Sequence, residues 1–193
     1  MYPITYNFKR IALANKVTAR DNSGAVILFA HQKMLKLREK IIIFADTEKT
    51  HQLGELNADK VLDFSVTQTF SNTSGRDQVK IRRAGRKSIW RAHYEILSPA
   101  GETQFVIREQ KAWVKVADTI FSELPILGFF AGYFFNPKYN IFDKDEKVIG
   151  EIAKQPSFFE SNYTLQVDAP NADPLGVLPI ATLTVITRER MRG

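Results

Sequence analysis

The stretch Tyr94-Glu-Ile-Leu-Ser-Pro-Ala-Gly-Glu-Thr-Gln-Phe-Val-Ile107 decides the fold of this chain. It consists of two runs rich in aromatic and β-branched residues around a Ser-Pro-Ala-Gly turn, which is the pattern of a β-hairpin. The stretches 17–29, 64–81 and 139–152 repeat this pattern in full, and 163–167 repeats its first half. One hairpin is only marginally stable alone, whereas several can share a core. The sequence therefore predicts a mostly antiparallel β-structure.

The composition fits one β domain that spans residues 1–193, since sandwiches and barrels of this length occur undivided. Apolar residues make up 44% of the chain and aromatic residues 11%, which is enough for a single core. Cysteine is absent, which excludes a disulfide scaffold and a Cys-based zinc site and suits a reducing cytoplasm. Residues 1–10 lack the pattern of a secretory signal, and no apolar run is long enough to span a bilayer. We therefore expect a soluble, cytoplasmic protein.

Several other segments have recognisable patterns. Residues 41–45 predict a buried strand that pairs with 52–57, and residues 30–40 predict a helical turn or an irregular connection. Apolar residues with helical spacing predict a short amphipathic helix: Trp113, Val116, Ala117, Ile120, Phe121 and Leu124. Pro125 ends or kinks that helix, and residues 127–135 form either a buried strand or an apolar loop.

Residues 174–188 predict a C-terminal helix with Asp173 as its N-cap and Pro174 in the first helical position. Apolar residues occur on nearly every face of this helix, so it must be buried. A β-strand over 182–187 is the alternative, because threonine, valine and isoleucine favour strands. About a dozen short strands and one wholly apolar helix are accommodated together when the sheet closes into a barrel around the helix.

At this level the chain resembles the tubby C-terminal-like superfamily, which includes tubby proteins, phospholipid scramblases and LURP-one-related proteins. The resemblance rests on the Tyr-x-Ile-x-Ser/Asp openings of the hairpins at Tyr94 and Tyr139, the strand pair after each, and the apolar helix at 174–188. It covers almost the whole chain and implies a 12-stranded barrel around a central helix. For function it implies phosphoinositide binding, as in tubby proteins, or lipid scrambling, as in scramblases.

The chain departs from the scramblase pattern in two respects. It has no cysteine cluster for palmitoylation. The segment from Asp143 has acidic residues at the first and third positions of a Ca²⁺ loop, Asp143 and Asp145. Lys147 stands where the loop needs an oxygen ligand, and Val148 stands where it needs glycine. We therefore expect a polar hairpin turn there and no calcium site.

Signatures of catalysis are missing from the sequence. His31, His51 and His93 have no neighbours at metal-ligand spacing, Gly-x-Ser-x-Gly is absent, and residues 85–88 lack the glycines of a phosphate loop. We assign no catalytic residue, metal or cofactor. The sequence favours a binding module over an enzyme.

The best candidate for function is a basic segment. The chain carries a net charge of +6, and residues 79–90 contain five basic residues and no acidic one. The candidate residues for binding an anion or head group are Lys80, Arg82, Arg83, Arg86, Lys87 and Arg91. Such a group can bind a phosphorylated ligand through charge-assisted hydrogen bonds. The alternative is a solvated strand face whose cations suppress aggregation. Nucleic acid is disfavoured, because the run is short and has no recognition helix.

An aromatic cluster offers a second candidate surface. It consists of Phe129, Phe130, Tyr133, Phe134 and Phe135. These rings either plug one end of the barrel or contact a membrane interface or a protein partner. Taken together, the residues predict a non-enzymatic module that binds an anionic lipid head group or a phosphorylated ligand, peripheral to a membrane. The alternative is a protein-interaction or structural module with no lipid role.

Overall fold

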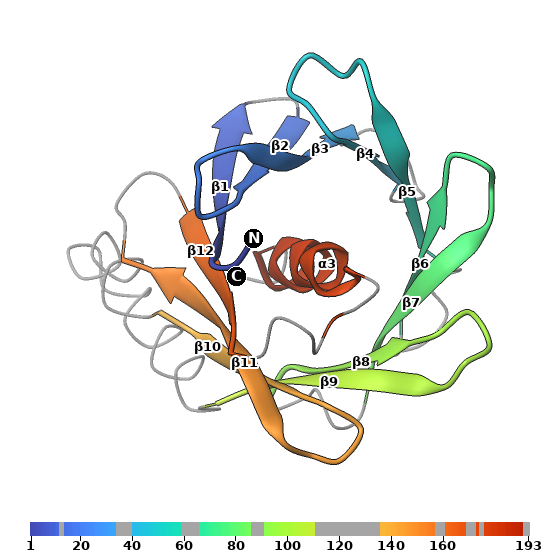
Figure 1. Cartoon of the computed structure of the whole chain (residues 1–193), viewed down its shortest axis with the longest axis vertical. Helices are drawn as coiled ribbons and strands as arrows, with labels where there is room; N and C mark the ends of the chain where they lie inside the picture. The colour runs from blue at the N-terminus through green and yellow to red at the C-terminus, as the bar shows by residue number, and fades with distance from the viewer. Residues whose placement is uncertain are drawn as a thin grey trace, which may run out of the picture.

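A computed structural model describes residues 1–11, 14–33, 40–58, 66–85, 91–110, 136–156, 161–168, 173 and 176–190. In this part of the chain, twelve antiparallel strands form a closed barrel, and one helix lies inside the ring of strands (Figure 1). The strands are β1 Ile4–Ile11, β2 Ala14–Arg20, β3 Val26–Lys33, β4 Lys40–Phe44, β5 Gln52–Ala58, β6 Thr67–Asn72, β7 Asp77–Arg83, β8 His93–Leu97, β9 Thr103–Glu109, β10 Lys138–Phe142, β11 Val148–Gln155 and β12 Ser161–Val167. The helix is α3, Leu178–Arg190.

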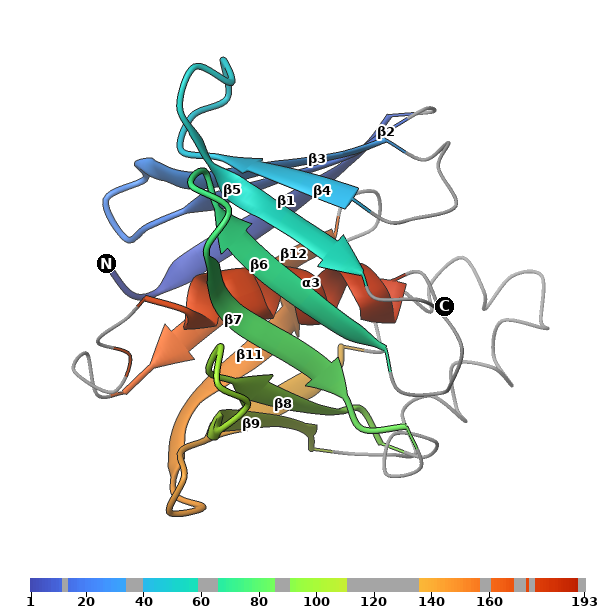
Figure 2. The same cartoon turned by 90° about the vertical axis from the view of Figure 1, so that its right-hand side faces the viewer.

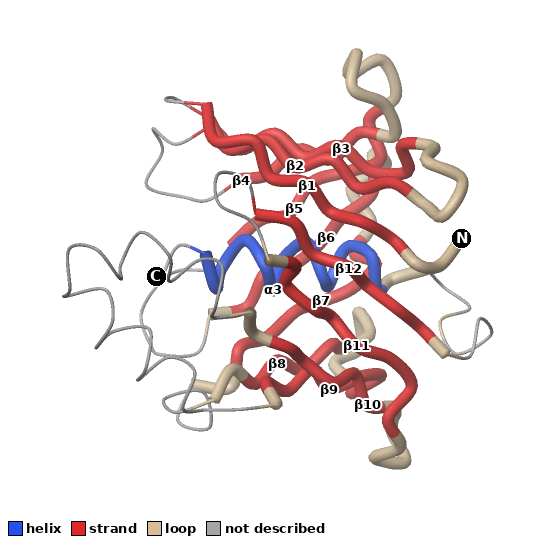
Figure 3. Tube along the Cα trace, turned by 90° about the vertical axis from the view of Figure 1, so that its left-hand side faces the viewer, coloured by secondary structure: helices blue, strands red, loops and turns tan. Residues whose placement is uncertain are grey.

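The strands follow one another around the barrel in sequence order, and β12 closes it by pairing with β1. Because every strand reverses the direction of the one before it, five hairpin turns lie at one end of the barrel, where α3 also begins (Figure 2). We call this the hairpin end. The opposite end, where α3 finishes, is called the basic end for the charges described below (Figure 3).

The hairpin turns share one backbone pattern. In the β2–β3 turn, the Gly24 N–H donates to the carbonyl of Asp21, and the Asp21 N–H donates to the carbonyl of Ala25. Gly24, Gly75 and Gly101 occupy equivalent positions with positive φ, and Glu146 takes that position in the β10–β11 turn with φ 58°. A register shift accompanies each turn, as expected for a bulge next to a tight hairpin.

The core lies between the inner faces of the strands and the helix. Its wall side includes three fully buried tyrosines, Tyr6, Tyr94 and Tyr139, together with isoleucines and leucines from most strands. Nine residues of α3 are buried, among them Leu178, Leu183 and Ile186. Because strands surround α3 on every side, its apolar residues need not be confined to one face of the helix.

Two glycines inside strands permit close backbone approach. A Cβ atom on Gly54 would stand 2.2 Å from the carbonyl oxygen of Ser71, and one on Gly150 would stand 2.3 Å from that of Gln166. Both distances are shorter than any real contact, so neither position can take a side chain without a backbone shift.

The start of α3 is fixed by hydrogen bonds to Asp173. Its Oδ1 atom accepts the N–H of Val177 and its Oδ2 atom that of Leu178, each at 2.9 Å. Asp173 therefore caps the helix, although α3 begins at Leu178 and not at the predicted Pro174. On the β1 side, the hydroxyl of Tyr2 donates to Asp173 at 3.2 Å, and that of Tyr6 donates to the carbonyl of Pro179 at 2.9 Å.

The predicted closed antiparallel barrel of about twelve strands is confirmed, as are the hairpins read from the sequence. Two expectations about individual segments were wrong or incomplete. Residues 30–33 continue β3 and are not a helical turn, and β1 was not recognised as a strand. The predicted amphipathic helix at 113–124 and the segment 127–135 lie outside the described residues.

Candidate anion-binding site

Strand β7 carries the first half of the predicted basic group. Its residues alternate, with Val79, Ile81 and Arg83 buried and with Lys80 and Arg82 on the outer face. The Lys80 ammonium donates to the carbonyl of Pro99 at 2.9 Å. Both Lys80 and Arg82 therefore lie on the outer surface, but each makes a contact with another part of the chain.

Arg82 forms an ion pair with Glu95 on the neighbouring strand β8. Its Nε and Nη2 atoms donate to Glu95 Oε2 at 2.8 and 2.5 Å. The Arg82 side chain is 47% exposed, and pairs with such exposure contribute no more than about 1 kcal/mol to stability. This contact therefore neutralises part of the predicted site at little energetic gain, and an anion can compete for the guanidinium.

Arg83 does not lie at the outer surface, where we expected a ligand-binding residue. It is buried, with 7% of its surface exposed, because it shares the inward parity of Val79 and Ile81. Its Nε atom lies 3.6 Å from Glu189 Oε1, near the end of α3, and its guanidinium carbon lies 5.9 Å from the centre of the Tyr94 ring. Arg83 thus joins the barrel wall to the helix.

The basic end contains a buried polar cluster around that ion pair. The Tyr94 hydroxyl donates to Glu189 Oε1 at 2.6 Å, and Glu109 Oε2 accepts the N–H of Ala92 at 2.9 Å. Burial raises the pKa of Tyr94 and of Tyr139 well above the usual value, and the Glu189 carboxylate adds to the rise for both. The ion pair and the hydrogen bonds therefore fix these side chains inside the barrel. The side chains of Glu109 and Glu189 both face inward.

Sequence reasoning missed the two buried glutamates. A signal existed for Glu109, because it has the same parity as Phe105 and Ile107, which are buried in β9. Glu189 gave no comparable signal, since its partner Arg83 lies more than a hundred residues away in the sequence.

The rest of the predicted site is only partly described. Arg91 is exposed and lies two residues before β8. Arg86 and Lys87 lie outside the described residues, as does the whole aromatic cluster: Phe129, Phe130, Tyr133, Phe134 and Phe135.

Basic residues collect at the end of the barrel where α3 finishes. We considered the described residues that occupy the last two positions of each strand or helix at this end, together with those in the connections. Where their side chains are described, they comprise eight basic and two acidic residues: Lys40, Arg82, Arg83, Arg91, Arg108, Lys138, Lys154 and Arg190, against Glu109 and Glu189. Four of the eight form ion pairs with acids elsewhere on the barrel, Lys40 with Glu55, Arg82 with Glu95, Arg108 with Glu146 and Lys138 with Glu151. The side chains of both acids are buried, so the exposed charges among these described residues are basic.

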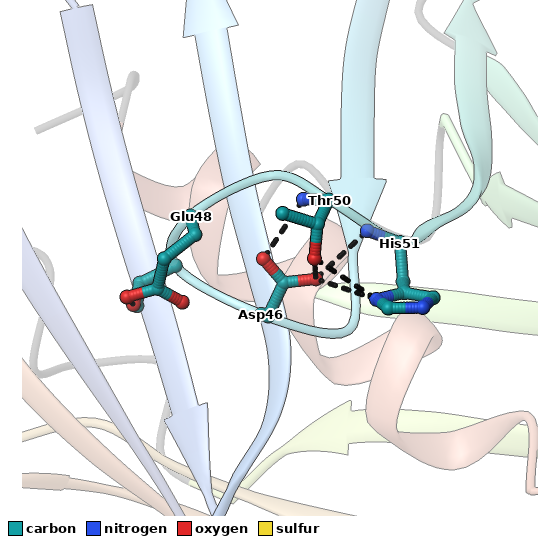
Figure 4. A network of polar contacts seen from close by, with 5 residues as sticks. Asp46, Glu48, Thr50 and His51 are labelled. Carbon is teal, nitrogen blue, oxygen red and sulfur yellow. Dashed lines mark hydrogen bonds and ion pairs between the residues drawn. The ribbon is translucent and has the colours of Figure 1, made fainter.

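At the opposite end of the barrel, two turns are closed by hydrogen bonds to an aspartate side chain. Asp46 accepts the N–H groups of Thr50 and His51 at 2.9 and 2.8 Å, and His51 Nδ1 lies 3.5 Å from its carboxylate (Figure 4). Asp143 Oδ1 accepts the N–H groups of Asp145 and Lys147, both at 2.9 Å, as expected for a polar turn. In both turns the carboxylate is therefore engaged in hydrogen bonds that close the hairpin.

The described ranges contain no group of three or more histidine, aspartate or glutamate side chains that could hold a metal ion. Among the same residues, no helix has both the length and the apolar character that a membrane crossing requires. Comparisons with protein-family models, curated proteins and solved structures found no match to the chain.

Proposed function

We propose that this chain is a non-enzymatic, tubby-like binding module that recognises an anionic lipid head group or similar phosphorylated ligand at a membrane surface. The observation that carries the proposal is the charge of the described residues at the basic end, where the exposed charged side chains are basic and the two acidic ones are buried. Among the described residues, Arg82 and Arg91 are the exposed arginines that lie closest in sequence to the turn between β7 and β8.

The tubby-like assignment is supported by the arrangement of the elements. Twelve antiparallel strands follow in sequence order around a closed barrel, and a C-terminal helix with nine buried residues lies within the ring. This is the architecture that the resemblance of the sequence to that superfamily implies. A fold alone does not fix a function, so the proposal rests on the basic end.

The chemistry of the site suits a phosphate group. Arginine presents planar N–H donors that match phosphate oxygens in pairs, and its charge persists at every physiological pH. Glu95 engages Nε and Nη2 of Arg82, which leaves Nη1 outside that contact. A basic side chain near an anionic membrane contributes about 1 kcal/mol to binding, so several are required for firm association.

Sedimentation with vesicles tests the proposal. The vesicles contain phosphatidylcholine alone, or with phosphatidylserine or a phosphoinositide. We expect binding only to the anionic vesicles and a steep loss of binding with salt. Arg82→Gln and Arg91→Gln should each weaken binding about fivefold, because each removes one charge from the surface that contacts lipid.

Two matched variants sharpen the test. Arg76→Gln removes an exposed arginine from the β6–β7 turn at the opposite end and should change binding little. Glu95→Gln frees Arg82 and should strengthen binding. If the parent chain binds neutral and anionic vesicles equally, the proposal is wrong.

The alternative, a protein-interaction module, is favoured by one observation on the outer wall. Phe44 and Ile42 of β4 are half-buried on this side, and Phe29, opposite Phe44 in β3, is 5% exposed. Ala30 and Ile43, the neighbours with the opposite parity, belong to the core. Apolar docking through this wall would persist at high salt, where head-group binding would be lost.

A further inference from the structure

The strands of the barrel form two halves, β1–β6 and β7–β12, that repeat each other. Because the strands follow in sequence order around the ring, each strand of the first half lies opposite its counterpart in the second, as β1 lies opposite β7 and β4 opposite β10 (Figure 1). The corresponding hairpins β2–β3 and β8–β9 have the same register and a bulge at the same step: Ala19 with Leu28 and then Arg20 with Val26, against Ile96 with Phe105 and then Leu97 with Thr103. Gly24 and Gly101, both with positive φ, take the same place in the two turns.

The hairpins β4–β5 and β10–β11 share side chains as well as register. Both carry a bulge at the same step, and their equivalent positions hold the same lysine, isoleucine, phenylalanine, glycine and glutamate: Lys40 and Lys138, Ile43 and Ile141, Phe44 and Phe142, Gly54 and Gly150, Glu55 and Glu151. In each hairpin the lysine forms an ion pair with the glutamate. In each, the glycine lies against a backbone carbonyl of the next strand, that of Ser71 in β6 or of its counterpart Gln166 in β12.

The pairings beside these hairpins repeat too. This is seen for β1–β2 and β7–β8, for β3–β4 and β9–β10, and for β5–β6 and β11–β12: Tyr6 with Ala19 and Ile81 with Ile96, Phe29 with Phe44 and Val106 with Phe142, Leu56 with Phe70 and Ile152 with Leu165. The seams between the halves agree as well. Leu165 of β12 pairs with Ile4 of β1, and their counterparts Phe70 of β6 and Val79 of β7 pair with each other.

Barrel geometry alone does not account for this agreement. A constant stagger of the strands would make the registers alike without any likeness between side chains. The ion pair and the close glycine contact, however, recur together at equivalent places in β4–β5 and β10–β11. The repeat therefore extends from the backbone to the side chains.

The single helix α3 is the part that the two halves do not share. Phe8 of β1 and Arg83 of β7 are equivalent, because they pair with the equivalent residues Val17 and Tyr94. Arg83 and Tyr94 both contact Glu189, whereas Phe8 lies 4.6 Å from the guanidinium carbon of Arg190. The inner walls of the halves thus differ where they meet different sides of the end of one helix.

We propose that the barrel is a tandem repeat of one six-stranded unit, in which β1–β6 and β7–β12 complete the barrel for each other around a single helix. A repeat of this kind buries its hydrophobic face only against a neighbouring copy. Because the last strand of each unit pairs with the first strand of the other in one register, two units close the ring. The partner of each unit is therefore a second copy of the same design. This inference is independent of any ligand, and it predicts that corresponding hairpins are interchangeable.

Two hairpin grafts into the full chain test the repeat. In the equivalent graft, residues 40–57 are replaced by the sequence of residues 138–153, with isoleucine in place of Tyr139 because this position faces the core. In the control graft, the same residues are replaced by the sequence of residues 16–31 from β2–β3, which has the same register and bulge but is not the counterpart. The control places Leu28 where β5 has Gly54, against the carbonyl of Ser71.

Thermal denaturation followed by circular dichroism compares the grafts. The equivalent graft should unfold cooperatively with a Tm within about 5 °C of the parent, whereas the control should lose more than about 10 °C or fail to fold. An equivalent graft that is no more stable than the control would overturn the repeat.

Matched single substitutions provide a second test that needs no graft. Gly54→Ala and Gly150→Ala each place a Cβ against the carbonyl of the next strand, so both should lower the Tm and by similar amounts. A large fall for one variant and none for the other would show that the two hairpins are not equivalent, which would also overturn the repeat.

Discussion

Replacement of Arg83 by methionine should strongly destabilise the barrel. The Arg83 side chain is 8% exposed and that of Glu189 is 6% exposed, so the change leaves a carboxylate buried beside the Tyr94 hydroxyl without this partner. Removal of one member of a buried ion pair costs about 3–5 kcal/mol. A domain is typically stable by about 5–15 kcal/mol, so the loss amounts to about a fifth or more of the total. For a chain of this length, it corresponds to a fall of roughly 10 °C in Tm.

Thermal and urea denaturation, followed by far-UV circular dichroism, measures this loss. Arg82→Met is the matched control, because it changes the next residue, which faces outward with 47% exposure, and should shift stability by about 0.5 kcal/mol or less. Arg83→Met combined with Glu189→Gln should be more stable than the sum of the single changes predicts, since the buried charge is gone. The reasoning is refuted if Arg83→Met is as stable as Arg82→Met, or if the two changes are simply additive.

Three further predictions concern the core, a turn and the effect of pH. Leu183→Ala on the fully buried face of α3 should cost about 2–5 kcal/mol in urea denaturation, and an unchanged midpoint would contradict its position in the core. Glu146→Gly should stabilise the β10–β11 turn by roughly 1 kcal/mol, because Glu146 has φ 58° where other turns have glycine; a lower Tm would count against this strain. Burial raises the pKa of Tyr163 to about 12, above the value of about 10 in an unfolded chain, so its contribution to stability is complete below pH about 10 and is lost as pH rises towards 12. Tyr163→Phe should make that alkaline decline shallower, and an identical decline would show that Tyr163 does not contribute to it.

Most of the barrel could be predicted from the sequence, because the residues that specify each hairpin lie close together in the chain. Alternation and turn residues specify each hairpin within about fifteen residues, and the hairpins dictate antiparallel neighbours. Strand β1 was overlooked although Ile4, Tyr6 and Phe8 alternate with polar residues and are buried. That signal was present, and only the lack of a following turn with glycine distinguished it from the recognised strands.

The start of α3 was misplaced because two local signals conflict. An aspartate followed by proline is typical of a helix start, and it placed the first helical residue at Pro174. Gly176, however, has φ 63°, which a right-handed helix excludes. The Asp173 carboxylate instead reaches the N–H groups of Val177 and Leu178. A cap that acts across a turn cannot be distinguished from a direct cap by residue spacing alone.

The burial of Arg83 shows the limit of local reasoning about the candidate site. Arg83 shares the inward face of β7 with Val79 and Ile81, but a cation in a basic run was assumed to face a ligand. Burial depends on Glu189, which comes next to it only after the barrel closes around α3. The same holds for the basic end, because the strand directions gather residues from the whole sequence there.

The aspartates at the hairpin end serve the chemistry of the turns themselves. Asp21 and Asp143 each close a turn by accepting two backbone N–H groups on Oδ1, and Asn72 accepts the N–H groups of Ser74 and Arg76 in the same way. The carbonyl oxygen of asparagine therefore suffices for the turn, and the negative charge is not needed for it.

This equivalence allows the charge of the hairpin end to be changed without changing the fold. In the double variant Asp21→Asn with Asp143→Asn, both Oδ1 acceptors remain while two negative charges disappear, so we expect the unfolding midpoint to stay close to that of the parent. The reverse variant, Asn72→Asp, adds a charge at the equivalent acceptor and should likewise leave the midpoint close to that of the parent. A midpoint well below that of the parent in the double variant would show that the carboxylate charge, and not only its oxygen, holds these turns.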